Sequence, residues 1–152
     1  MNILVSACLL GVSCRYDGNS KPREAVLALM EKHTLIPVCG EIFGGLPTPR
    51  HPSERRDGGV YMVTGENVTA QYERGANEVL RLARLYDCRV AVLKERSPSC
   101  GSGRIYDGTF TNTLTDGWGV TAEKLRDNGM KIYGESEIDA LIADLEEEKY
   151  DK

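Results

Sequence analysis

The sequence predicts an α/β fold, a single-domain three-layer αβα sandwich with a mainly parallel, Rossmann-like sheet. Short apolar runs alternate with segments of helical periodicity, which indicates βαβ units. The apolar runs are nearly continuous, as in parallel strands that are covered on both faces. A length of 152 residues fits one domain. We therefore expect residues 1–152 to fold as one unit.

Four apolar segments are the predicted strands of this sheet. Pro37 indicates that the second of them lies at an edge of the sheet or near a strand end, because proline cannot donate a ladder hydrogen bond. The segments are 2–7, 34–38, 89–93 and 131–133, and a further short strand is expected at 60–63.

Helical periodicity separates the strands. The clearest predicted helix covers residues 67–86, where apolar side chains recur on one face. Further helices are expected over 22–32, 121–128 and 138–145, the last from its i, i+3, i+4, i+7 spacing. Two segments rich in glycine and proline, 39–58 and 94–119, are expected to be long loops, and loops of that length are usually functional or disordered.

Composition narrows the choice of partners. The net charge of −4 and the pI of about 5.3 argue against DNA or long RNA, because binding to many phosphates requires a basic field. The first residues lack the basic and apolar regions of a signal peptide, and no segment approaches the roughly 18 apolar residues of a membrane span. We expect a cytoplasmic protein without a membrane partner, in which cysteines stay reduced.

Three cysteines follow three predicted strands. Cys8 and Cys39 come directly after the first and second strands, and Cys100 lies in the loop after 89–93. Ligands of open parallel sheets bind at the carboxyl ends of the strands, so these cysteines are predicted to meet at one site. Cys88 precedes a strand and is expected to be a buried structural residue. The role of Cys14 is left open by the sequence: it is a fourth ligand, a redox partner or a bystander.

The pattern of cysteines favours an iron–sulfur cluster over structural zinc. Zinc sites usually contain C-x-x-C pairs and four ligands, and no such pair occurs here. Three thiolates with one open position suit a cluster that acts on a substrate. Zinc bound by three cysteines and a water stays an alternative. A phosphate-binding domain is disfavoured, because no G-x-G-x-x-G or P-loop follows the first strand.

Three segments each contain one of these cysteines: residues 8–18 (CLLGVSCRYDG), 39–50 (CGEIFGGLPTPR) and 94–101 (KERSPSCG). Together these motifs resemble the thiouracil desulfidase (TudS-like) family, formerly a family of unknown function. One departure is Gly40, where the family usually has proline. The resemblance implies a 4Fe-4S cluster on Cys8, Cys39 and Cys100 that takes sulfur from a thiolated uracil base or nucleotide and releases the oxo base and sulfide.

The same segments contain groups for the remaining chemistry. Glu41 lies two residues after a proposed ligand and is the candidate general base. Ser97 or Ser99 would hydrogen-bond or protonate the substrate ring, and the sequence does not choose between them. Candidate contacts for a nucleotide phosphate or uracil oxygens are Arg15, Lys21, Arg50 and Arg104. The alternative function is a non-catalytic thiol or metal-binding module, either a redox sensor or a sulfur carrier.

Overall fold

The computed structural model describes residues 1–147, so the predicted domain extends past the described part of the chain. Its centre is a parallel sheet with strand order β2-β1-β5-β8. The strands are β1 (Asn2–Ser6), β2 (Thr34–Val38), β5 (Val90–Leu93) and β8 (Lys131–Gly134). The predicted α/β class and parallel sheet are confirmed, and β2 with Pro37 is an edge strand.

The strand order creates a switch point between β1 and β5. The chain moves from β1 to β2 on one side and then returns to place β5 on the other side of β1. Connections after β1 and β5 therefore leave in opposite directions and open a crevice at the carboxyl ends of these strands.

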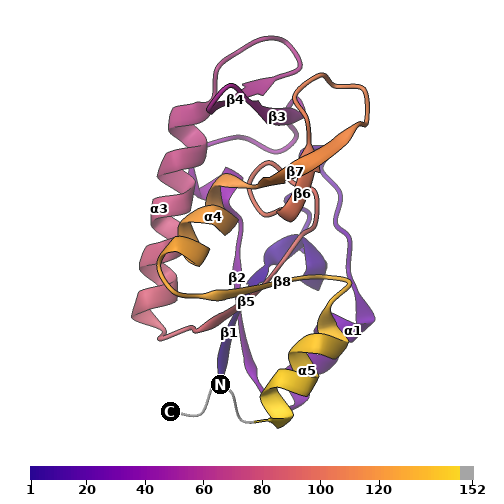
Figure 1. The fold of residues 1–152 in the computed structure, drawn as a ribbon, viewed down its shortest axis with the longest axis vertical. Helices are drawn as coiled ribbons and strands as arrows, with labels where there is room; N and C mark the ends of the chain where they lie inside the picture. Colours follow the sequence, from indigo (N-terminus) through magenta and orange to yellow (C-terminus); the bar gives the residue numbers. More distant parts are fainter. Residues whose placement is uncertain (148–152) are drawn as a thin grey trace.

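Helices cover both faces of the sheet (Figure 1). Alternate strand residues point to opposite layers: Ile3 and Val5 pack in one core cluster, whereas Leu4 and Leu93 pack in the other. One layer contains α1 (Glu24–Leu27), η2 (Ala28–Glu31) and α5 (Ile138–Glu146); the other contains α3 (Thr69–Leu85) and α4 (Val120–Asp127).

The predicted helix over 22–32 is shorter and irregular in the structure. Its first residues are extended, because the backbone N–H groups of Lys21 and Arg23 bond to the carbonyls of Cys8 and Leu9. These carbonyls belong to the 3-10 turn η1 (Ala7–Leu10). The helix therefore begins at Glu24 and tightens into the 3-10 turn η2.

The two predicted long loops contain regular structure. The first contains the short helix α2 and the strand β3, which pairs with the expected β4; the second contains the hairpin β6–β7. The bounds are α2 (Gly40–Phe43), β3 (Ser53–Arg56), β4 (Gly59–Met62), β6 (Ser102–Tyr106) and β7 (Leu114–Trp118). The strand β4 is the apolar run expected at 60–63, whereas β3, β6 and β7 are mostly polar and lack the apolar pattern that predicts strands.

Both hairpins lie beyond the carboxyl ends of the sheet, at the end of the molecule opposite the N-terminus (Figure 1). Among residues 1–147, no helix has both the length and the apolar content needed to cross a bilayer.

Candidate active site

A cavity of about 580 Å³ opens at the carboxyl edge of the sheet. Residues from the ends of β1, β2 and β5 form part of its wall, and the two hairpins, α3 and the loops between the elements contribute further residues. Its position is therefore the one that the strand order predicts for a ligand.

The three cysteines singled out in the sequence all line this cavity. Cys8 lies in η1 directly after β1, Cys39 precedes α2 directly after β2, and Cys100 lies between β5 and β6. All are free thiols. The structure thus brings together side chains that are as many as 92 positions apart in the sequence (100 minus 8).

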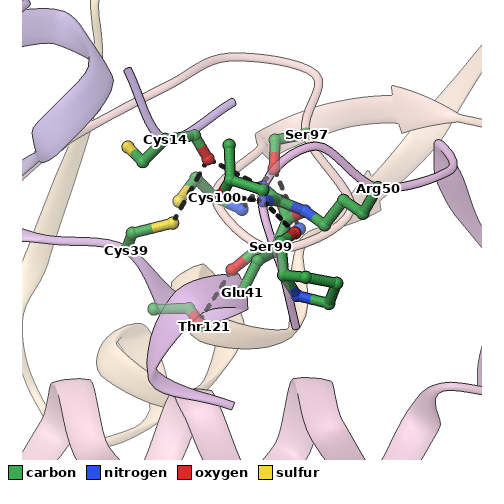
Figure 2. A network of polar contacts seen from close by, with 10 residues as sticks. Cys14, Cys39, Glu41, Arg50, Ser97, Ser99, Cys100 and Thr121 are labelled. Atoms are coloured by element: carbon green, nitrogen blue, oxygen red, sulfur yellow. Dashed lines mark hydrogen bonds and ion pairs between the residues drawn. The ribbon is translucent and has the colours of Figure 1, made fainter. Parts of the chain in front are cut away.

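Cys14 lies among these thiols. It is 7% exposed, its thiol is hydrogen-bonded to both Cys8 and Cys39, and its carbonyl lies 4.0 Å from the Cys39 sulfur. Figure 2 shows Cys14, Cys39 and Cys100 in one network of polar contacts. The sequence left the place of Cys14 open, and the structure puts it within the cysteine group.

The surroundings of Cys14, Cys39 and Cys100 favour the protonated form of these three thiols. The hydrogen bond with Cys14, followed by burial, raises the pKa of Cys39 far above its ordinary value. Burial raises the pKa of Cys100 to about 12, although hydrogen bonds from Ser6 and Ser99 oppose the change. The hydrogen bond with Cys39 lowers the pKa of Cys14, but the bond with Cys8 and burial together raise it to about 11. Binding of a metal to Cys39 and Cys100 would therefore release protons.

Cys88 is separate from this group. It precedes β5 at the amino end of the sheet, is 8% exposed and packs with the core cluster of α3 and α4. Burial and the nearby Asp87 raise its pKa to about 11, so it is an unreactive structural thiol, as the sequence predicted.

Glu41 reaches the cavity from the first turn of α2. Its Oε2 atom accepts a 2.8 Å bond from the Nε of Arg50, whose side chain is only 2% exposed. Arg50 also donates from Nη2 to the carbonyl of Cys14 at 2.9 Å. The guanidinium therefore fixes the carboxylate and the Cys14 segment together (Figure 2).

Glycines set the position of α2. A Cβ atom on Gly75 of α3 would lie 1.7 Å from the Gly40 carbonyl oxygen, so the two helices touch through their backbones. At Gly40 itself a Cβ would lie 2.5 Å from Oγ1 of Thr121 and 2.7 Å from Oγ of Ser99. In this chain, the hydroxyl groups of Thr121 and Ser99 therefore occupy the space beside Gly40, the position where the family usually has proline.

The structure distinguishes the two candidate serines. Ser97 lines the cavity, and its Oγ accepts the backbone N–H groups of Ser99 and Cys100 at 3.0 and 3.1 Å. Its own hydroxyl proton is left to donate elsewhere. Ser99 is 2% exposed, and its Oγ lies 3.0 Å from that of Thr121 (Figure 2).

The candidate cations differ in position. Arg15 and Lys21 line the cavity, as does Arg50, whose nitrogens are already bonded to the protein. Arg104 lies on β6 and pairs with the exposed carboxylate of Asp116 at 3.3 Å. The structure thus places Arg104 away from the cavity that contains the others.

Several residues of the site were not singled out in the sequence. Ser6 ends β1, and its Oγ accepts the backbone N–H of Lys94 at 2.9 Å. Lys94 lines the cavity, and its Nζ lies 3.1 Å from the buried carboxylate of Glu135. Ser6 is the last residue of β1 and Lys94 directly follows β5, so both lie at the predicted carboxyl edge of the sheet, a signal that would have found them. Glu135 gives no such signal.

The model of the 2-thiouracil desulfurase family matches residues 3–137. The chain belongs to this family. The resemblance of the three motifs is thereby confirmed.

Two relatives support the assignment. The YbbK protein of Bacillus subtilis (strain 168) is 37% identical over 150 residues, 92% of this chain and 99% of the relative. The solved structure of TudS, a 4Fe-4S-dependent thiouracil desulfidase, is similar with a TM-score of 0.90 and 44% identity, covering 95% of this chain and 97% of the other. This similarity also confirms the predicted fold class.

The lining of the cavity fits an iron–sulfur cluster. Cys8, Cys39 and Cys100 line a cavity that has room for a multi-atom inorganic group. A donor set of thiols without imidazole is typical of iron–sulfur clusters.

Proposed function

We propose that the chain is a 4Fe-4S-dependent desulfidase that removes sulfur from thiouracil or a thiolated uridine nucleotide and gives the oxo base and sulfide. The observation that carries the proposal is the presence of three free thiols from three strand ends around one cavity, in a member of the desulfurase family. The named activity of the TudS relative supports the choice of cluster and substrate.

Cys8, Cys39 and Cys100 would hold the cluster. When bound, a cluster with one iron free of protein ligands supplies a soft Lewis acid for the thiocarbonyl sulfur. The other tasks belong to the chain: one group must accept a proton from the attacking water, another must hydrogen-bond the ring, and a cation must offset the charge of the leaving sulfide.

Glu41 is the proposed general base of a hydrolytic replacement of C=S by C=O. Its carboxylate lies in the cavity, where the ion pair with Arg50 fixes its position for taking a proton from water. Arg50 is therefore a positioning residue for Glu41, which replaces its earlier interpretation as a contact for a phosphate or a uracil oxygen.

Ser97 is the proposed hydroxyl donor to the substrate ring, because it lines the cavity and its oxygen is held by two backbone N–H groups. Lys94 is the proposed cation for the departing sulfide, with Glu135 holding its ammonium at the wall. Arg15 and Lys21 stay candidates for a nucleotide phosphate.

Sulfide release from 2-thiouracil under anaerobic conditions tests the proposal. We expect Glu41→Gln to keep the cluster absorbance and lose most turnover, about 100-fold or more as for a general base. Glu73→Gln, an exposed change on α3, is the matched control and should retain full activity. Full turnover in Glu41→Gln would remove Glu41 from the mechanism.

The serines provide an internal comparison. We expect Ser97→Ala to lose turnover by at least about tenfold, since general acid or hydrogen-bond catalysis contributes that much or more. Ser99→Ala should have a smaller effect, because its hydroxyl contacts Thr121 and Cys100. The reverse order of the two effects would contradict the assignment of the donor to Ser97.

The alternative function is a thiol-based redox or sulfur-carrier module without catalysis. The contacts of the Cys14 thiol with Cys8 and Cys39 favour it, because neighbouring thiols can form disulfides. It predicts that Cys14→Ser abolishes function and that no thiobase yields sulfide. Normal sulfide release by Cys14→Ser would exclude this alternative.

A cytoplasmic location and the folding of residues 1–152 as a single domain stay predictions.

A further inference from the structure

The tip of the β6–β7 hairpin, residues 107–113, reaches the same cavity as the cysteines. Phe110 and Asn112 line it together with Cys8 and Glu41, although they belong to an element outside the sheet. Phe110 is half-buried and Asn112 is exposed. None of the cluster or proton-transfer tasks assigned above uses these two side chains.

A buried carboxylate holds the tip in place. Glu54 of β3 is 8% exposed, and its Oε1 accepts the backbone N–H groups of Gly108 and Phe110 at 2.9 and 3.1 Å. A side chain at Gly108 would collide with Arg56, since its Cβ would lie 2.6 Å from the Arg56 Cβ. The tip is therefore fixed against the β3–β4 hairpin.

Along the tip, residues whose side chains bond to one another alternate with residues that line the cavity. The hydroxyl groups of Thr109, Thr111 and Thr113 are linked to one another at 2.6 and 2.9 Å. The residues between them, Phe110 and Asn112, both line the cavity. The threonine ladder is satisfied within the hairpin, so the alternation presents one aromatic ring and one amide to the cavity.

The backbone of the tip is strained at these same two positions. Phe110 has φ of 58° and Asn112 has φ of 59°, in the left-handed region that most side chains avoid. Asparagine tolerates this region, but phenylalanine is unfavourable there. Such strain persists where the surroundings impose it and is found at ligand sites.

We propose that Phe110 and Asn112 recognise the pyrimidine ring of the thiolated substrate, with Glu54 as the residue that positions them. Phe110 stacks on the planar ring, and the Asn112 carboxamide hydrogen-bonds the imide edge, where an N–H donor lies next to a carbonyl acceptor. An amide offers the matching acceptor and donor. The inference rests on the proposed desulfidase function and assigns base recognition to a segment that contains none of the cluster ligands.

The test uses Phe110→Asn and Asn112→Gly, which remove the ring or the amide and still tolerate a positive φ. The cluster-loaded protein is assayed anaerobically for turnover of 2-thiouracil and for binding of uracil by calorimetry. We expect both KM and the uracil dissociation constant to rise about tenfold in Phe110→Asn, as for the loss of one base–aromatic stack. A smaller rise of about fivefold is expected for Asn112→Gly.

Iron content and cluster absorbance should stay unchanged in both variants, because neither side chain is a proposed ligand. Thr111→Ala, on the other side of the same tip, is the matched control and should leave KM and uracil binding unchanged. Glu54→Ala should raise KM as Phe110→Asn does. Glu54→Gln should keep KM close to that of the unaltered chain, because glutamine keeps one acceptor oxygen.

The inference would be overturned if KM and uracil binding were unchanged in both Phe110→Asn and Asn112→Gly. In that case, sulfide release by the unaltered chain would still uphold the desulfidase proposal. Absence of both turnover and uracil binding in the unaltered chain would overturn both proposals.

Discussion

The sheet and the rim of the cavity are built by different forces. We define the rim as the two hairpins, residues 53–62 and 102–118. In the sheet, strand residues such as Leu4, Val5 and Leu93 are fully buried and pack between two helical layers. In the rim, Glu54 and Arg55 bond to backbone groups of the other hairpin, at Gly108 and Trp118.

This difference means that the sheet mainly determines the stability of the protein, whereas the rim mainly determines how side chains are placed around the cavity. Burial of apolar area is not directional, so it holds the sheet together without placing any one polar atom. The rim depends on charged groups and hydrogen bonds with defined geometry, which fix side chains around the cavity. We therefore expect changes in the sheet to act on global unfolding and changes in the rim to act on local order and turnover.

The largest expected effect on stability belongs to the sheet. Leu93→Ala removes a fully buried side chain of β5 and should lower the free energy of unfolding by about 3 kcal/mol. Urea denaturation followed by circular dichroism measures the change. Leu85→Ala, at a position 70% exposed, should change it by less than about 0.5 kcal/mol. Equal effects would show that the core of the sheet does not dominate stability.

An effect of similar or slightly smaller size is expected at the ion pair between Arg50 and Glu41. Arg50→Met leaves a partly buried carboxylate without its cation and should cost about 2–3 kcal/mol of unfolding free energy. Arg104→Met breaks an exposed pair with Asp116 and should cost less than about 1 kcal/mol. If Arg50→Met kept both stability and turnover, the positioning role of Arg50 would be wrong.

The smallest global effect is expected in the rim. Glu54→Ala should lower the unfolding free energy by only about 1 kcal/mol. Amide hydrogen exchange at Gly108 and Phe110 should nevertheless accelerate by about tenfold, because both N–H groups lose their acceptor. Unchanged exchange at these two amides would show that Glu54 does not hold the tip.

The sheet was predictable from the sequence because its signal is local. Apolar runs at the four strands indicate a parallel sheet, and Pro37 indicates an edge of the sheet or a strand end, without any long-range information; the strand order did not follow from the sequence. The convergence of Cys8, Cys39 and Cys100 also followed, because each residue comes after a strand and parallel strands share one carboxyl edge.

Most of the rim was not predictable by the same means. Its apolar strand β4 was expected, but β3, β6 and β7 are mostly polar and pair by backbone bonds that leave no hydrophobic period. The choice between Ser97 and Ser99 depends on which hydroxyl meets Thr121, 22 positions away from Ser99. The pairing of Arg50 with Glu41 and of Glu54 with Gly108 likewise depends on side-chain geometry that sequence spacing does not contain.

The central claim is that Cys8, Cys39 and Cys100 hold one iron–sulfur cluster at the carboxyl edge of the sheet. Anaerobic quantification of iron and acid-labile sulfide on the purified protein tests it most directly. We predict equal amounts of iron and sulfide, in the ratio to protein of one 4Fe-4S cluster per chain. Each of Cys8→Ser, Cys39→Ser and Cys100→Ser should lose most of the iron, and Cys88→Ser should retain it. Iron-free protein after anaerobic preparation, or full iron content in all three ligand variants, would contradict the account.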